Sequence, residues 1–219
     1  TSDGLTHVYN FAVGDKTAGV HSISKAMLET GFGNSLVNGA IYTMTVSATD
    51  AASNVVSTIN KKSLIYDNTS PVISSVTPAS SSFINNGFVV NYTLGESVPL
   101  GSITFTRTGG TSDGLTHVYN FAVGDKTAGV HSISKAILEA GFGNALVDGA
   151  IYTMTVSATD AASNAATPVI KIVITFDNTS PIISSVTPVT SSSINQFNLA
   201  YTIGETVQSG TITFVRTGG

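Results

Sequence analysis

Gly149-Ala-Ile-Tyr-Thr-Met-Thr-Val-Ser-Ala-Thr-Asp160 is the stretch of this 219-residue chain that decides its fold. The apolar side chains of Tyr152, Met154, Val156 and Ala158 alternate with a second set made of Ile151 and four hydroxyl residues. In a strand, such alternation places one set on a buried face and the other in water. The pattern therefore predicts a half-buried β-strand, and the small polar residues after Asp160 predict a loop.

The same stretch occurs a second time, as residues 39–50, inside a longer repeat. Residues 1–54 match residues 111–164 at all but four positions, so the period is 110 residues. Solenoid repeats have periods of about 20 to 50 residues, whereas this period has the size of an independent domain. The repeat therefore predicts modules that each bury their own core.

Apolar segments separated by turn signals predict six or seven strands in one full period. These expected strands are residues 71–78, 88–94, 102–107, 115–123, the segment around Tyr152, and 169–176. A helical turn is expected at residues 132–139, and a turn at Gly109-Gly110. The first copy predicts a strand at 5–13, a helical segment at 21–29 closed by glycine, the Tyr42 strand and a strand at 63–66; the third predicts strands at 181–188, 197–203 and 211–216. The spacing predicts an all-β, two-sheet Greek-key sandwich.

Asp148-x-Ala150-x-Tyr152-x-Met154 resembles the tyrosine corner that leads into strand F of an immunoglobulin-like sandwich, with Met154 where antibody domains have a cysteine. The continuation from Val156 to Asn164 resembles the bacterial immunoglobulin-like and fibronectin-type-III-like tandem repeats of large surface adhesins. The resemblance implies a linear array of immunoglobulin-like Greek-key β-sandwiches. In the earlier copy Asn38 stands where the later one has Asp148, so the corner aspartate is not required in every module.

The proline-fenced segment from Pro71 to Pro78 suits the first, edge strand of a module. We therefore expect residues 70–178 to form a complete module, residues 1–69 the C-terminal part of one, and residues 179–219 the N-terminal part of the next. Half a sandwich exposes a sheet edge and part of its core. Two interpretations remain open: a segment cut from a longer covalent array, or strand complementation between separate copies.

The composition excludes several classes of function. Only 10% of residues are charged, the net charge is −4 and the pI is near 5.4, so the chain offers no basic stripe for nucleic acid. There is no cysteine for a disulfide or thiol chemistry, and no apolar run of about 18 residues that would span a bilayer. No catalytic motif is found, so we expect no enzyme activity. The four histidines are interpreted as ordinary surface residues.

The carboxylates are few, and several fall in loops. If modules stack head to tail, Asp67 at the exit of one module approaches Glu96 and Asp160 in loops of the next. Three carboxylates with nearby amide and backbone oxygens form the hard ligand set that calcium prefers. The residues expected at such calcium sites are Asp50, Asp67, Glu96, Asp160, Asp177 and Glu205.

A simpler interpretation of these aspartates stays open. Asp67 and Asp177 precede Asn-Thr-Ser-Pro, where an Asx turn is the ordinary use of aspartate, and Asp160 can cap its own loop. The next junction would pair Asp177 with Glu205, its third acid lying in a following module, and Asp50 would serve the junction before the first. The repeated adhesins that this chain resembles often bind calcium at such linkers.

The repeat, the low charge and the resemblance together indicate a structural segment of an extracellular or cell-surface stalk or filament. Its partners would be neighbouring copies or modules of the same protein, and a cell-surface or glycan target would be reached through other regions. An alternative is a module that binds a ligand such as a glycan through its loops, acting by avidity. The absence of tryptophan disfavours this alternative. A third class is the accessory domain of an enzyme.

Overall fold

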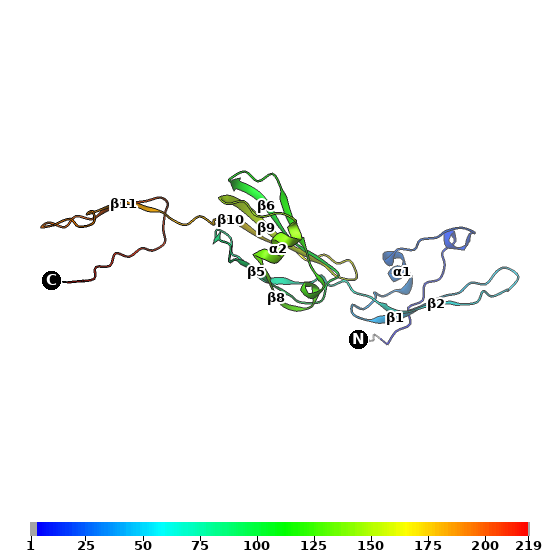
Figure 1. Ribbon diagram of the computed structural model, residues 1–219. Helices are drawn as coiled ribbons and strands as arrows, with labels where there is room; N and C mark the ends of the chain where they lie inside the picture. Colours follow the sequence, from blue (N-terminus) through cyan, green and yellow to red (C-terminus); the bar gives the residue numbers. More distant parts are fainter. Residues whose placement is uncertain (1–3, 219) are drawn as a thin grey trace.

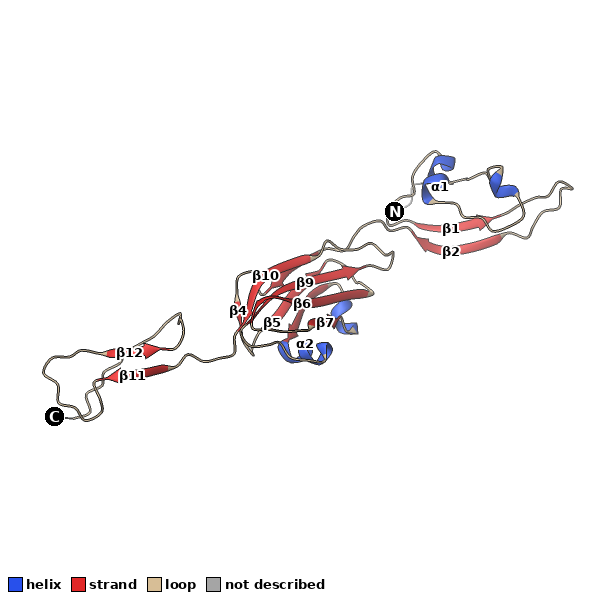
Figure 2. Cartoon of the chain, turned by 90° about the horizontal axis from the view of Figure 1, so that it is seen from above, coloured by secondary structure: helices blue, strands red, loops and turns tan. Residues whose placement is uncertain are grey.

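The structure of the chain, a computed structural model, describes residues 4–218. Strands dominate the described part, which also contains two short α-helices and two 3-10 helices. Figures 1 and 2 both show a central unit with several paired strands and an open, thin segment at each end of it. The prediction of an all-β chain is confirmed.

Two sheets form the central unit. The larger one has the order β4 (Phe83–Ile84), β10 (Val169–Phe176), β9 (Ala150–Thr159), β6 (Leu100–Gly110) and β7 (Thr116–Asn120). The smaller one has the order β3 (Ile73–Thr77), β5 (Val89–Leu94) and β8 (Gly129–Ser134). All neighbours are antiparallel except β4 and β10, which pair in parallel.

Strand β9 behaves as its alternation predicts. Ala150, Tyr152, Met154, Val156 and Ala158 are buried, while the residues between them are half-buried. Their side chains join one apolar cluster that draws members from both sheets and lies wholly between residues 73 and 176. The core of the described chain is therefore that of the central unit alone.

Helix α2 (Lys135–Phe142) follows β8 directly, and η2 (Val123–Lys126) precedes β8. The Ser134 hydroxyl accepts a hydrogen bond from the Ile137 backbone N–H and caps the start of α2. Gly143, with φ of 74°, closes the helix through its N–H bond to the Glu139 carbonyl. The glycine stop expected in the first copy is confirmed at Gly33, the counterpart of Gly143. Helix α2 begins three residues later than expected because residues 132–134 belong to β8.

The two flanking segments lack a core. The N-terminal one contains η1 (Gly14–Lys16), α1 (Lys25–Phe32), β1 (Ile41–Val46) and β2 (Ile59–Ile65). The C-terminal one contains β11 (Ile183–Thr187) and β12 (Ala200–Ile203). Met44 in β1 is 46% exposed, whereas Met154, at the same place in an identical strand sequence, is 0% exposed. Burial of this sequence thus depends on what packs against it.

Two expected strands are missing from the flanking segments. Residues 5–13 and 211–216 have no strand structure, although their counterparts lie in β7 and β6. In the central unit β7 pairs only with β6, so the N-terminal segment has no strand for residues 5–13 to join. The strand prediction was wrong at both places because the pairing partner is absent from the same segment.

The expected turn at Gly109-Gly110 was also wrong. Both glycines lie in β6, after an irregularity in its pairing with β9 near Arg107. Gly110 has φ of 64°, and an added Cβ would lie 2.1 Å from the Gly149 carbonyl oxygen, so glycine is required where the strand passes this close to its neighbour. Among the described helices, none is long and apolar enough to cross a bilayer.

Replacement of Leu94 by alanine is expected to lower the free energy of unfolding of the central unit by about 2 to 5 kcal/mol, because it leaves a cavity in the core. Leu94 is 1% exposed, whereas Leu100 is 64% exposed and provides the control. Leu100→Ala is expected to change stability by less than about 0.5 kcal/mol. Urea unfolding followed by far-UV circular dichroism measures both, and equal effects of the two changes would contradict the described core.

Candidate functional site

The loop between β9 and β10 is built around Asp160. Its Oδ1 accepts backbone hydrogen bonds from Ala162 and Asn164, and its Oδ2 accepts one from the Asn164 side chain, all at 2.8 Å. Burial alone raises the pKa of Asp160, but these hydrogen bonds outweigh it and hold the pKa below its usual value. Asp160 therefore stays ionised and, as the simpler interpretation predicts, caps its own loop.

The same loop holds the linker that leads into the central unit. The Asn164 side chain also donates to the Asp67 carbonyl oxygen at 3.2 Å, a contact between residues 97 positions apart. Asp67 lies two residues after the end of β2, and its Oδ1 accepts a hydrogen bond from the Thr69 backbone at 2.9 Å. This is the expected Asx turn, and it fixes the start of the linker.

Three of the six predicted ligands meet at this junction. Asp67, Glu96 and Asp160 each present one carboxylate oxygen, and these oxygens lie within 4.8 Å of one another. We call this group the junction cluster. None of the ion pairs found among residues 4–218 involves any of the three. Among the described residues, no ion pair therefore offsets their mutual repulsion, and hard oxygen donors of this kind suit Ca²⁺.

The other three predicted ligands do not form such a group among the described residues. Asp50 lies in an exposed loop that repeats the Asp160 loop, with its Oδ1 accepting from the Ala52 and Asn54 backbones. Asp177 forms an Asx turn with the Thr179 backbone at 3.0 Å. Glu205 is exposed. Among the described residues, none of these three carboxylates meets the further acidic side chains that a second cluster would need.

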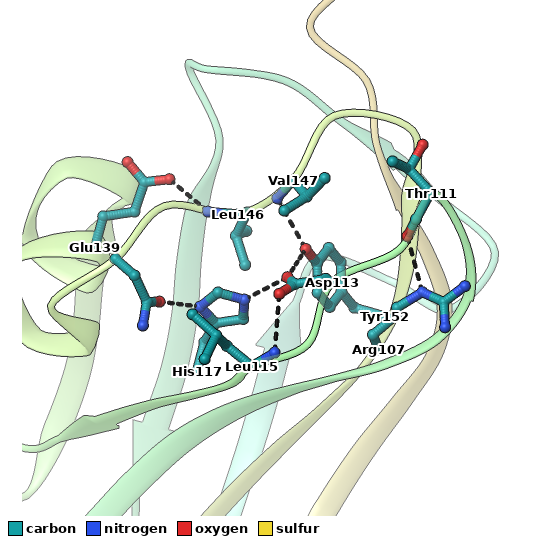
Figure 3. A network of polar contacts seen from close by, with 10 residues as sticks. Arg107, Thr111, Asp113, Leu115, His117, Glu139, Leu146, Val147 and Tyr152 are labelled. Atoms are coloured by element: carbon teal, nitrogen blue, oxygen red, sulfur yellow. Dashed lines mark hydrogen bonds and ion pairs between the residues drawn. The ribbon is translucent and has the colours of Figure 1, made fainter.

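A polar network inside the central unit escaped the sequence analysis (Figure 3). The His117 side chain is 0% exposed, so its interpretation as a surface histidine was wrong. Its Nε2 lies 2.6 Å from Asp113 Oδ2, and its Nδ1 contacts Asn144 Oδ1. The alternation of His117 with Tyr119 and Phe121 on β7 and beyond was the signal that places this ring on the buried face.

Tyr152 connects this network to the backbone. Its hydroxyl accepts a hydrogen bond from the Val147 N–H at 2.9 Å and donates to Asp113 Oδ2 at 2.6 Å (Figure 3). The bond to an amide five residues upstream is the one that defines a tyrosine corner. Burial raises the pKa of Asp113, but the hydrogen bonds from Tyr152, His117 and the Leu115 N–H outweigh burial and lower it. The network therefore locks the loops at one end of the unit.

The junction cluster and the Tyr152 network have different chemical capacities. The network satisfies its own polar groups, and among the described residues no buried side-chain nitrogen or oxygen is left without a partner. The cluster instead presents several carboxylate oxygens to one point and can bind a hard cation. Comparison of the chain with protein-family models and with curated proteins found no match.

Replacement of Tyr152 by phenylalanine is expected to lower the stability of the central unit by about 1 to 3 kcal/mol, because it leaves the Val147 N–H and Asp113 without this partner. Tyr42 accepts the equivalent bond from Val37 at 2.9 Å in the N-terminal segment and supplies the control. Tyr42→Phe is expected to leave unfolding of the central unit unchanged in urea titrations. A loss of the same size in both variants would argue against the network.

The lowered pKa of Asp113 predicts how stability depends on pH. A carboxyl with a lowered folded-state pKa stabilises the fold above about pH 4, and this contribution is lost as the pH falls through the lowered value. Unfolding free energies measured from about pH 5 to about pH 2 should therefore fall more steeply for the wild type than for Asp113→Asn. Asp15→Asn, in the N-terminal segment, should retain the wild-type slope. Parallel curves for wild type and Asp113→Asn would refute the assignment.

Proposed function

We propose that this chain is a structural repeat segment of an extracellular or cell-surface, adhesin-like stalk or filament, made of immunoglobulin-like Greek-key sandwiches held end to end. The observation that carries the proposal is that one core, confined to residues 73–176, is flanked on both sides by partial copies of the same sequence. Segments of the same sequence on both sides of one folded unit are what a linear array has in every period.

The restraint of both linkers supports this role. Before the central unit, the Asn164 side chain binds the Asp67 carbonyl. After it, Asp148 accepts hydrogen bonds from the Asn178 backbone at 2.6 Å and from the Thr179 hydroxyl at 2.6 Å. Short linkers that are bonded to the body of a module leave little free swing, so successive modules keep a defined direction. A stalk needs this property to hold a binding region away from a surface.

The surface chemistry also suits a spacer. Charged residues make up only 10% of the chain, and the outward positions of strands such as β9 carry hydroxyl groups. Such a surface provides solubility without a strong field of either sign. The partners of the segment are then the neighbouring modules of the same protein, and the adhesion target is met by other regions.

Calcium at the junction cluster would stiffen the array further. The ligands are Asp67 from the linker and Glu96 and Asp160 from two loops of the central unit, so a bound cation would tie the linker to the module. The geometry fits because the three carboxylates converge and none of them forms an ion pair within residues 4–218. When bound, the ion supplies only charge neutralisation and a fixed joint.

The calcium proposal predicts that millimolar Ca²⁺ raises the unfolding temperature of EDTA-treated protein by roughly 5 °C or more, because a ligand that binds only the folded state stabilises it. Glu96→Gln should abolish the increase, since it removes one of the three converging carboxylates. Glu205→Gln, at the equivalent position in the C-terminal segment, should retain it. The proposal is contradicted if the unfolding temperature measured by scanning calorimetry changes with neither EDTA nor calcium.

The array itself is tested by the shape of a polypeptide in which two copies of the chain are fused directly, Gly219 to Thr1. Small-angle X-ray scattering should give a maximum dimension that roughly doubles relative to the single chain while the cross-section stays constant, as expected of a quasi-one-dimensional array. The fused segments should also form one additional folded unit, visible as added cooperative unfolding enthalpy. A compact particle without directional growth would exclude the stalk.

A further inference from the structure

The dipeptide Asn-Gly occurs twice in the chain, as Asn38-Gly39 and as Asn86-Gly87. In this dipeptide the glycine nitrogen can attack the side-chain amide of the asparagine, because glycine has no Cβ to hinder the approach. Both asparagines are exposed. Sequence and exposure therefore give the two sites the same reactivity, and a difference between them must come from their hydrogen bonds.

Asn38 is held at both ends of its side chain. Its Oδ1 accepts a hydrogen bond from the Asn68 backbone at 2.7 Å, and its Nδ2 donates to the Thr69 hydroxyl at 2.6 Å. The attacking nitrogen is held as well, because the Gly39 N–H donates to the Tyr66 carbonyl at 2.7 Å. The amide carbon and the glycine nitrogen therefore approach each other only when these bonds open together.

Asn86 lies in the turn that joins β4 to β5, where these restraints are absent. The Phe88 N–H closes the turn by donating to the Asn85 carbonyl at 3.0 Å. The Gly87 N–H donates to the Asn85 Oδ1 at 2.9 Å, so its acceptor is an exposed side chain and not the backbone of a paired strand. The Asn86 side chain makes no hydrogen bond within residues 4–218. Its amide is thus free to reach the Gly87 nitrogen.

We propose that Asn86 is a site of spontaneous, non-enzymatic deamidation, and that the fold protects Asn38 from the same reaction. The Gly87 nitrogen forms a bond to Cγ of Asn86, the bond from Cγ to Nδ2 breaks, and the amide leaves as ammonia with the Gly87 proton. Water then opens the cyclic imide. Opening at Cγ gives aspartate, and opening at the main-chain carbonyl gives isoaspartate, in which the backbone runs through the side chain.

The two products differ in their effect on the central unit. Each adds one negative charge to a chain of net charge −4, but only isoaspartate lengthens the backbone of the turn. The turn holds Phe88, which is 9% exposed, with its ring centroid 6.1 Å from that of Phe105 and 6.5 Å from that of Phe176. Before the turn, the Ile84 carbonyl accepts a hydrogen bond from the Asp177 backbone at 2.9 Å. Isoaspartate therefore disturbs both the core and the start of the second linker.

The experiment follows deamidation of the full 219-residue chain in mildly alkaline buffer, by peptide mapping with mass spectrometry. Asp148→Asn supplies a matched site, because it creates Asn-Gly in the central unit at the counterpart of Asn38. There the Gly149 N–H donates to the Phe176 carbonyl at 2.8 Å. Asn86 should convert at least about tenfold faster than this introduced asparagine, which reacts only after local opening.

Two controls separate the fold from the sequence. In concentrated urea the two sites should convert at similar rates, because unfolding removes the hydrogen bonds that distinguish them. Gly87→Ala should slow conversion of Asn86 severalfold in the folded protein. The added Cβ would meet only the Asn85 Oδ1, at 3.4 Å, so this variant should keep the fold.

Equal rates at Asn86 and at the introduced asparagine in the folded protein would overturn the proposal. A rate at Asn86 that rises in urea as steeply as that of the introduced asparagine would also overturn it.

The effect on stability has its own measurement. The isoaspartate form, separated by ion exchange, should unfold at a lower urea concentration than the unmodified chain. Asn86→Asp carries the same charge on an unchanged backbone and should keep the wild-type midpoint. Equal midpoints for all three proteins would refute the role assigned to the turn.

Discussion

Strand β6 is the element on which the folded part of this chain depends. It makes backbone hydrogen bonds to β7 on one side and to β9 on the other, and it places Ile103 and Phe105 in the core. Residues 4–69 have nearly the same sequence as the part of the central unit that pairs with β6, but they contain no counterpart of β6 itself. In this segment the apolar side chains of β1 are therefore exposed. Pairing across the sequence, and not local propensity, therefore decides whether these segments form a unit with two sheets and a core.

Features set by local chemistry could be predicted from the sequence, and features set by distant partners could not. The alternation of β9 and the glycine stop of α1 involve neighbouring residues, and both were predicted correctly. Strand β8 is stabilised by pairing with β5, and the extension of β6 through Gly109 and Gly110 is stabilised by pairing with β9. Neither feature could be predicted from the local sequence. His117 was missed for a related reason: its partners Asp113 and Asn144 come together only in the fold.

The junction cluster could be predicted from the sequence because it depends only on the direction in which the chain enters the central unit. Once the boundary at the Asn-Thr-Ser-Pro linker is fixed, the chain before the linker must face particular loops of the central unit, which brings Asp67 to Glu96 and Asp160. The hydrogen bonds that each carboxylate accepts could not be predicted from the sequence. Asp160 uses both carboxylate oxygens for hydrogen bonds within its own loop, and Asp67 uses one in its turn. Only the fold shows that one oxygen of each also lies within 4.8 Å of a Glu96 oxygen.

The proposed array and the proposed calcium site constrain each other through charge. In an array, the next junction would bring Asp177 and Glu205 beside the counterpart of Asp160 in the following module, in the arrangement that Asp67, Glu96 and Asp160 have here. Three converging carboxylates oppose such a junction by repulsion, while the apolar faces beside them favour it. A cation that binds only the ordered junction would therefore stabilise it, and ordering of the junction would raise the affinity for the cation by the same factor. Calcium binding and order at the junction would then be two expressions of one linked equilibrium.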